Sequence, residues 1–213
     1  MKNNCFSYDL VKNSFALELS NDIDMYEEEY KTYLKDNFFD FEFEVNNIIN
    51  TQKYYNMDTE RDGFREDCIR KNFEKIYSHF PKGKYFGQWG SDHTYLRDRG
   101  GPDKIDNCFA TFLNSGFEPT KGKVISIMYF YKDSKSMIRG KKHGEAKVNE
   151  VSKVGILAEE SKDDYTLIRF DGEGAPFGSK PFLVSCPLEG GTKDYYQFGI
   201  LIKNSPATRP YGD

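Results

Sequence analysis

Two stretches before residue 81 carry the apolar periodicity of helices. In the first, residues 22 to about 50, aromatic and aliphatic side chains recur every three or four positions, which is the spacing of one helix face. The second covers residues 58–80, and Pro81 with Gly83 ends it. The first stripe consists of Tyr26, Tyr30, Tyr33, Leu34, Phe38 and Phe41, and the second of Phe64, Cys68, Ile69, Phe73, Ile76, Tyr77 and Phe80. We therefore expect helices over both stretches.

Short apolar runs then predict strands that alternate with helices. Residues 84–89 are expected to form a short buried strand, with the turn 90–93 at its C-terminal end. A helix is expected around residues 105–115, closed by Gly116, and the clearest strand of the sequence follows at 124–131. The order helix, strand, helix, strand predicts a parallel sheet covered by helices.

The pattern becomes less regular beyond residue 132. Glycine and charged residues dominate 139–153, which is expected to be an exposed loop, and two further strands are predicted at 164–170 and 197–202. The glycine-rich stretch 172–178 between them lacks the strand-then-helix context of a dinucleotide-binding loop, so we interpret it as a turn-rich connection. The fold class expected is α/β, with a mostly parallel or mixed sheet flanked by helices. Residues 1–213 are expected to form a single domain with an irregular C-terminal region.

Composition narrows the classes of function. Thirty basic and 34 acidic residues give a formal charge of −4, with no basic cluster, so a nucleic-acid partner is not expected. The four cysteines are widely spaced, form no C-x-x-C pair and have no zinc-ligand spacing, which is typical of reduced thiols in a cytoplasmic protein. They are Cys5, Cys68, Cys108 and Cys186. No apolar run approaches the ~18 residues of a membrane span, and no signal peptide is visible. We expect a cytoplasmic protein with no membrane association, no metal and no cofactor.

His93 is the first candidate for chemistry. It lies in the turn expected at the C-terminal end of a strand, where parallel sheets place their ligands, and Gly87 and Gly90 remove side chains around it. A histidine in such a turn can act as general base, general acid or metal ligand near neutral pH. The structural alternative is a histidine that only forms hydrogen bonds within its loop.

The preceding helix adds charged candidates. Arg61 and Arg65 are four residues apart and share one helix face, Glu66 is adjacent, and Asn72 continues the side of Arg65. Such residues can clamp a carboxylate or polarise a carbonyl group. An ordinary solvated face of charged residues is the alternative explanation of the same pattern.

These residues together resemble a known signature. The motif consists of Arg65, Glu66, Ile69 and Asn72 on the helix, followed by Gly87, Gly90 and His93 in the strand and turn. It resembles the second signature of the erythromycin esterase family, which belongs to a wider group with haem-associated and Tiki-type protease-like members. The specific part of the resemblance covers residues 58–96, the best-matched region extends to residue 131, and a looser agreement runs on to the C-terminus. The family usually has methionine where Ile69 stands.

The resemblance implies a hydrolase-type domain that acts on an ester or similar bond of a small-molecule substrate. It implies acid–base or water-activating work for His93, charge stabilisation or orientation for Arg65, and an assisting role for Glu66. The remaining candidates, as substrate-binding residues, are Arg61, Asp92 and Asn72.

One departure from the family pattern limits this expectation. The first signature of the family, a strand followed by Gly-Glu-x-x-His, is absent, and the only other histidines are His79 and His143. Either the chain is the C-terminal portion of a longer fold or it has lost the chemistry. We favour the portion, because a parallel sheet without its first strands would expose apolar edges. The partner expected to complete it is a missing N-terminal half or a second copy. The alternative function is a non-catalytic module that binds a small molecule, a metal centre or a protein.

Overall fold

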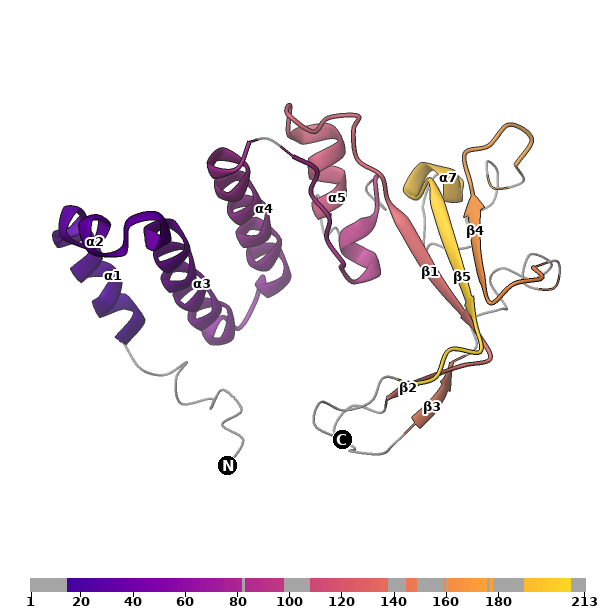
Figure 1. Ribbon diagram of the computed structural model, residues 1–213, viewed down its shortest axis with the longest axis horizontal. Coiled ribbons are helices and arrows are strands. Elements are labelled where there is room, and N and C mark those ends of the chain that lie inside the picture. The colour runs from indigo at the N-terminus through magenta and orange to yellow at the C-terminus, as the bar shows by residue number, and fades with distance from the viewer. Residues whose placement is uncertain are drawn as a thin grey trace. The chain divides into compact units, whose positions relative to one another are not determined.

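The structure divides the chain into two compact units. This computed structural model describes residues 15–81, 83–97, 108–137, 145–148, 159, 161–175, 177 and 190–207. The units are Met1–His79 and Phe80–Asp213 (Figure 1). Within the described ranges, no helix combines the length and the apolar character that crossing a bilayer requires.

The first unit is helical. Its helices are α1 (Phe15–Met25), α2 (Glu27–Leu34), α3 (Phe38–Asn56) and α4 (Arg61–His79). The first predicted helical stretch is confirmed, but it is broken at Tyr26 and again at the 3-10 turn Lys35–Asn37, where Lys35 has a φ of 52°. The second is confirmed as α4.

Few residues are buried in the core of this unit. Helix α1 packs on α3, and α3 packs on α4. The buried residues in the described part of the unit are Ala16, Ile23, Val45 and Glu66. Helix α4 therefore buries an acidic residue, and Phe73 from its predicted apolar stripe is only half-buried. Aromatic rings supply part of the packing, since Phe39 of α3 stacks on His79 of α4 with 3.9 Å between ring centroids.

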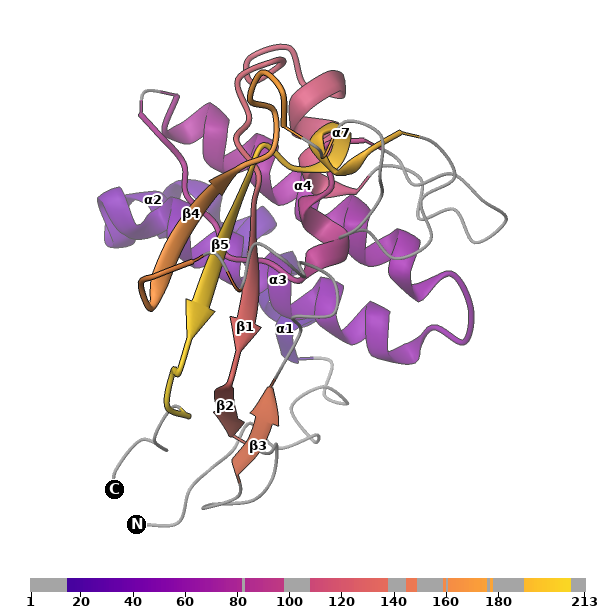
Figure 2. The ribbon, with the colours of Figure 1, turned by 90° about the vertical axis from the view of Figure 1, so that its right-hand side faces the viewer.

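The second unit contains a mixed three-stranded sheet. Its strands are β1 (Ile127–Lys132), β4 (Tyr165–Arg169) and β5 (Phe198–Lys203). Strand β5 lies in the centre, parallel to β1 and antiparallel to β4 (Figure 2). The α/β class, the mixed sheet and these three predicted strands are confirmed.

Two predictions for this unit are wrong. Residues 84–89 are extended but belong to no sheet among the described residues, and they are exposed rather than buried. Within the predicted loop 139–153, strand β3 (Glu145–Val148) pairs antiparallel with β2 (Ser134–Met137). The rest of that loop, 139–144 and 149–153, lies outside the described residues.

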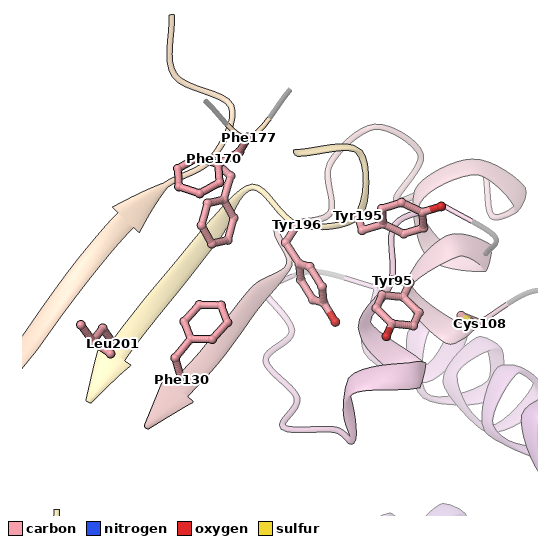
Figure 3. Close-up of a cluster of buried hydrophobic side chains, with 8 residues drawn as sticks. All are labelled: Tyr95, Cys108, Phe130, Phe170, Phe177, Tyr195, Tyr196 and Leu201. Carbon is pink, nitrogen blue, oxygen red and sulfur yellow. The ribbon is translucent and has the colours of Figure 1, made fainter. Parts of the chain in front are cut away.

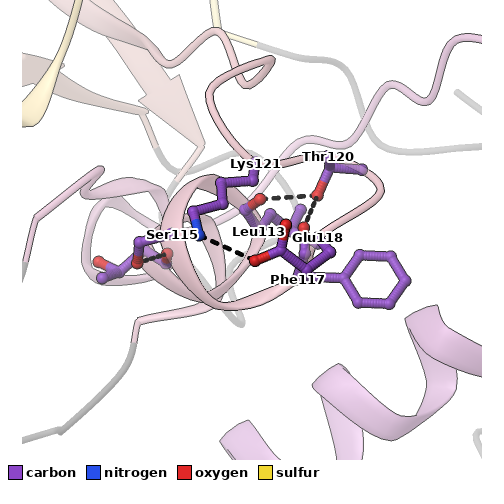
Figure 4. Close-up of polar contacts among 7 residues, drawn as sticks. Leu113, Ser115, Phe117, Glu118, Thr120 and Lys121 are labelled. Carbon is purple, nitrogen blue, oxygen red and sulfur yellow. Dashed lines mark hydrogen bonds and ion pairs between the residues drawn. The ribbon is translucent and has the colours of Figure 1, made fainter.

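The helix expected at 105–115 is confirmed in its described part. It consists of α5 (Phe109–Thr111) and a π-helical turn, Phe112–Gly116, which ends at the predicted glycine. Polar contacts hold the connection that follows it (Figure 4). The Thr120 hydroxyl donates to the Leu113 carbonyl at 2.6 Å, and Lys121 pairs with Glu118 at 2.8 Å. These contacts fold the connection back on the helical turn before β1 begins.

An aromatic cluster forms the core of the second unit (Figure 3). It contains Tyr95, Cys108, Phe130, Phe170, Phe177, Tyr195, Tyr196 and Leu201. Side chains alternate across a strand, so the other face of the sheet carries the residues between these. Three of them, Tyr129, Tyr165 and Leu167, are exposed, and we call this side the bare face of the sheet.

Gly199 of β5 is required by this core. A Cβ atom there would lie 2.5 Å from the Phe170 ring and 2.6 Å from the Phe130 ring. Gly199→Ala should therefore lower the free energy of unfolding of this unit by about 1–3 kcal/mol through overpacking. Urea denaturation would measure the loss, with Gly172→Ala as the control, because a Cβ atom at Gly172 meets nothing within 4 Å. Equal stabilities of the two variants would contradict the prediction.

Candidate functional site

The six predicted site residues fall into two groups. Arg61, Arg65, Glu66 and Asn72 lie on α4 in the first unit, and the turn Ser91–Thr94 of the second unit contains Asp92 and His93.

Arg61 is engaged at the turn between α3 and α4. Its Nε atom donates to the Met57 carbonyl at 2.5 Å, and its guanidinium lies 5.9 Å from the centroid of the Tyr54 ring. A cation at the carbonyl end of a helix is favoured by the helix dipole. These contacts give Arg61 a structural task that sequence spacing does not reveal.

Arg65 and Glu66 form an unequal pair. The Glu66 side chain is only 2% exposed, whereas the Arg65 side chain is partly exposed and also pairs with Asp62 at 3.3 Å. The buried Nε of Arg65 lies 4.0 Å from Oε1 of Glu66. A buried carboxylate is costly unless a cation or hydrogen-bond donors accompany it. Arg65 thus places positive charge next to a carboxylate that is shielded from water.

Asn72 and Cys68, two further residues of α4, have structural roles. The Asn72 side-chain amide donates to Oδ1 of Asn47 at 2.6 Å and so ties α4 to α3. Burial raises the pKa of the Cys68 thiol, and the opposing effects of Lys71 and Lys53 are smaller. A raised pKa keeps the thiol protonated, so Cys68 is a poor nucleophile.

The extended segment before His93 presents aromatic side chains to solvent. The Phe86 side chain is 88% exposed, and Trp89 is also exposed. The Trp89 indole folds over Gly87, so any side chain at Gly87 would collide with it. The close approach of the Trp89 indole therefore explains the glycine at position 87. A Cβ atom at Gly90 would meet only His93, at an ordinary van der Waals distance of 3.7 Å.

His93 is held in its turn and remains partly accessible. Its backbone N–H donates to the Gly90 carbonyl at 3.0 Å, and its ring lies edge-on to Trp89, with 6.1 Å between centroids. The residue as a whole is half-buried, and its Nδ1 atom is shielded from solvent.

The residues directly after His93 are anchored in the core. The Ser126 hydroxyl donates to the Thr94 carbonyl at 2.5 Å, and the Thr111 hydroxyl donates to the carbonyl of the buried Tyr95 at 2.8 Å. The backbone N–H of Leu96 donates to Tyr195 at 3.1 Å. Sequence reasoning missed these anchors because the partners lie 16 to about 100 residues away and follow no local pattern.

The chemistry open to this turn is acid–base work by an imidazole next to an exposed indole. A general base needs a fixed position and access to the reacting proton. The His93 backbone is held in its turn, and the residue is partly exposed. Within the part of the chain that the structure describes, no three His, Cys, Asp or Glu side chains are grouped so that they could hold a metal ion.

Comparisons with known proteins identify no relative of this chain. Neither the protein-family models, nor the curated proteins, nor the solved structures give a match to this chain.

Proposed function

We propose that this chain is a hydrolase-type domain that acts on an ester or similar bond of a small molecule, with His93 as its acid–base residue. The single observation that carries the proposal is the position of His93. The residue is partly accessible, and its backbone is fixed on one side by the hydrogen bond to Gly90 and on the other by the hydrogen bond between Ser126 and Thr94. The resemblance of the sequence around it to the erythromycin esterase signature supports the choice of bond.

The reaction that this arrangement suits is attack by water on a carbonyl carbon. Nε2 of His93 takes a proton from the water while the oxygen bonds to that carbon, and the ester C–O bond then breaks. An activated leaving group departs as its anion, whereas an ordinary alcohol needs a proton from an opposing acid. The exposed Trp89 ring offers an apolar surface to the rest of the substrate. Charge stabilisation by Arg65 and assistance by Glu66 stay predictions of the resemblance.

A second part of the proposal is that another polypeptide part completes the site. Hydrolysis of an unactivated ester is helped by a base and an opposing acid, and His93 supplies one such group. The bare face of the sheet offers a docking surface for such a part, because Tyr165 and Leu167 are 71% and 66% exposed there. Exposed contiguous apolar surface is typical of an interaction site. The completing part would be an N-terminal half with the first signature or a second copy.

Two esters test the proposal with the chain alone. We expect slow hydrolysis of 4-nitrophenyl acetate, because its leaving group departs without a proton, and no turnover of ethyl acetate, whose leaving group needs an acid. The release of nitrophenolate and of acetate, respectively, would be measured near pH 7.5. Hydrolysis of 4-nitrophenyl acetate no faster than by free imidazole at the same concentration would overturn the enzymatic proposal and favour the binding module. Turnover of ethyl acetate would show that the chain is self-sufficient.

A further inference from the structure

The first unit has a shallow hollow where α1 ends and α2 begins. Its volume is about 320 Å³, and its lining residues are Asp22, Tyr26, Glu29, Tyr30 and Tyr33. Asp22 lies in the last turn of α1, and the other four recur at the three- and four-residue spacing of one face of α2. Helices α1 and α2 are neighbours in the structure (Figure 1). This feature has no part in the hydrolase proposal.

Negative charge is concentrated around this hollow. Residues 15–34 contain six acidic residues and one basic residue, a net charge of −5 against −4 for the whole chain. The basic residue, Lys31, pairs with Glu27 at 2.8 Å and with Glu28 at 3.0 Å. The last turn of α1 contains no basic residue to balance the negative end of its dipole. Charge alone therefore favours a cation in the hollow.

The two carboxylates of the lining are placed differently. Asp22 accepts a hydrogen bond from the Tyr30 hydroxyl at 2.7 Å. The Glu29 carboxylate makes no hydrogen bond or ion pair with the residues that the structure describes. Asp22 thus holds the Tyr30 side chain in place, and the Glu29 carboxylate is open to a bound cation.

The tyrosine rings indicate which kind of cation fits. Tyr30 is held by Asp22 and by stacking on Phe41 with 5.9 Å between centroids, whereas Tyr26 and Tyr33 are 45% and 85% exposed. Aromatic faces attract cations, and Tyr faces with carboxylates suit weakly hydrated alkylated ammonium groups best. A primary ammonium retains more of its hydration and gains less from the rings.

We propose that the hollow formed by Asp22, Tyr26, Glu29, Tyr30 and Tyr33 binds a quaternary ammonium group. The free trimethylammonium compound and the headgroup of a choline lipid present the same chemistry, so both are tested. A few exposed cation–π contacts correspond to a dissociation constant on the order of 10 mM for a small ligand.

The test is a titration of the whole chain with choline, followed by the backbone amide resonances in NMR spectra at constant ionic strength. We expect saturable shifts at Tyr26, Glu29 and Tyr33, and a several-fold weaker response to 3,3-dimethylbutan-1-ol, which has the same shape without the charge. Co-sedimentation with phosphatidylcholine vesicles distinguishes the lipid source, because only a headgroup site would bring the chain down with the vesicles. Equal affinity for the uncharged analogue, or no saturable shifts with choline, would overturn the proposal.

Variants separate the two contributions to binding. Tyr33→Ala should weaken choline binding about fivefold, since one cation–π contact is lost, and Glu29→Gln should weaken it several-fold while keeping the shape of the side chain. Both residues are exposed, so the fold is retained. Tyr55→Ala is the matched control, because Tyr55 is an exposed tyrosine of the same unit outside the hollow. Unchanged affinity in both Tyr33→Ala and Glu29→Gln would place the ligand elsewhere.

Discussion

Replacing His93 with alanine should lower the hydrolysis of 4-nitrophenyl acetate by the chain by about 100-fold or more. Positioned general bases contribute roughly 10²–10⁴-fold, and an activated ester needs little else from the site. The lower end of this range is expected, because the leaving group of this ester departs without a proton and His93 therefore acts only as a base. Initial rates at saturating and at limiting ester would measure the change.

The matched control for this variant is His79→Ala. His79 is exposed and stacks on Phe39, so its removal takes an imidazole from the chain without touching the turn at residues 91–94. We expect the rate of His79→Ala to stay within a factor of two of the parent, while His93→Ala costs only about 1 kcal/mol of stability. Equal losses of rate in the two variants would identify the hydrolysis as nonspecific imidazole chemistry.

Phe170→Ala should lower the free energy of unfolding of the second unit by about 3–5 kcal/mol. The Phe170 side chain is 0% exposed, and its ring lies 4.8 Å from that of Phe177 and 6.3 Å from that of Phe130, centroid to centroid. Its truncation loses this burial and leaves a cavity between rings that are fixed on separate strands and turns. Single domains have about 5–15 kcal/mol of stability, so the loss is a large fraction of the total.

Tryptophan fluorescence during urea denaturation would measure this effect for the second unit alone. Trp89 is the single tryptophan of the chain and lies in that unit, 5.1 Å from Phe109 between ring centroids. A chain of two units need not unfold in one step, so a local probe is required. Phe86→Ala is the control, because an 88% exposed ring should cost no more than about 0.5 kcal/mol. Similar midpoints for the two variants would show that the aromatic cluster does not carry the stability.

The elements that sequence patterns predicted well are those with strong periodicity. The α4 stripe and the apolar runs of β1, β4 and β5 follow from period and composition alone, to within about three residues at each end. The prediction for residues 84–89 failed because an apolar run does not reveal whether a neighbouring strand is present to pair with it. Strand β3 was missed because Glu145–Val148 has the composition of a loop and depends on β2 for its pairing.

The candidate site was predictable only in part. The partial exposure of His93 and the close approach at Gly87 follow from a turn marked by glycines. The burial of Glu66 and the hydrogen bond from Arg61 to Met57 could not be predicted from the sequence, because both depend on how α3 and α4 pack. Tertiary contacts decide whether a charged helix residue is a structural partner or is open to a substrate, and spacing along one helix cannot resolve this.

The central place of β5 also determines when the sheet can form during synthesis. Strands β1 and β4 pair only with β5 among the described residues, and β5 follows both in the sequence, with Phe198 opposite Ile127. On the ribosome, β1 and β4 therefore remain unpaired until β5, the last of the three strands, has emerged. Pairing across some 70 residues requires the closure of a long loop, which slows folding. During that interval the nascent chain presents unpaired strand edges, the kind of surface that chaperones protect from aggregation.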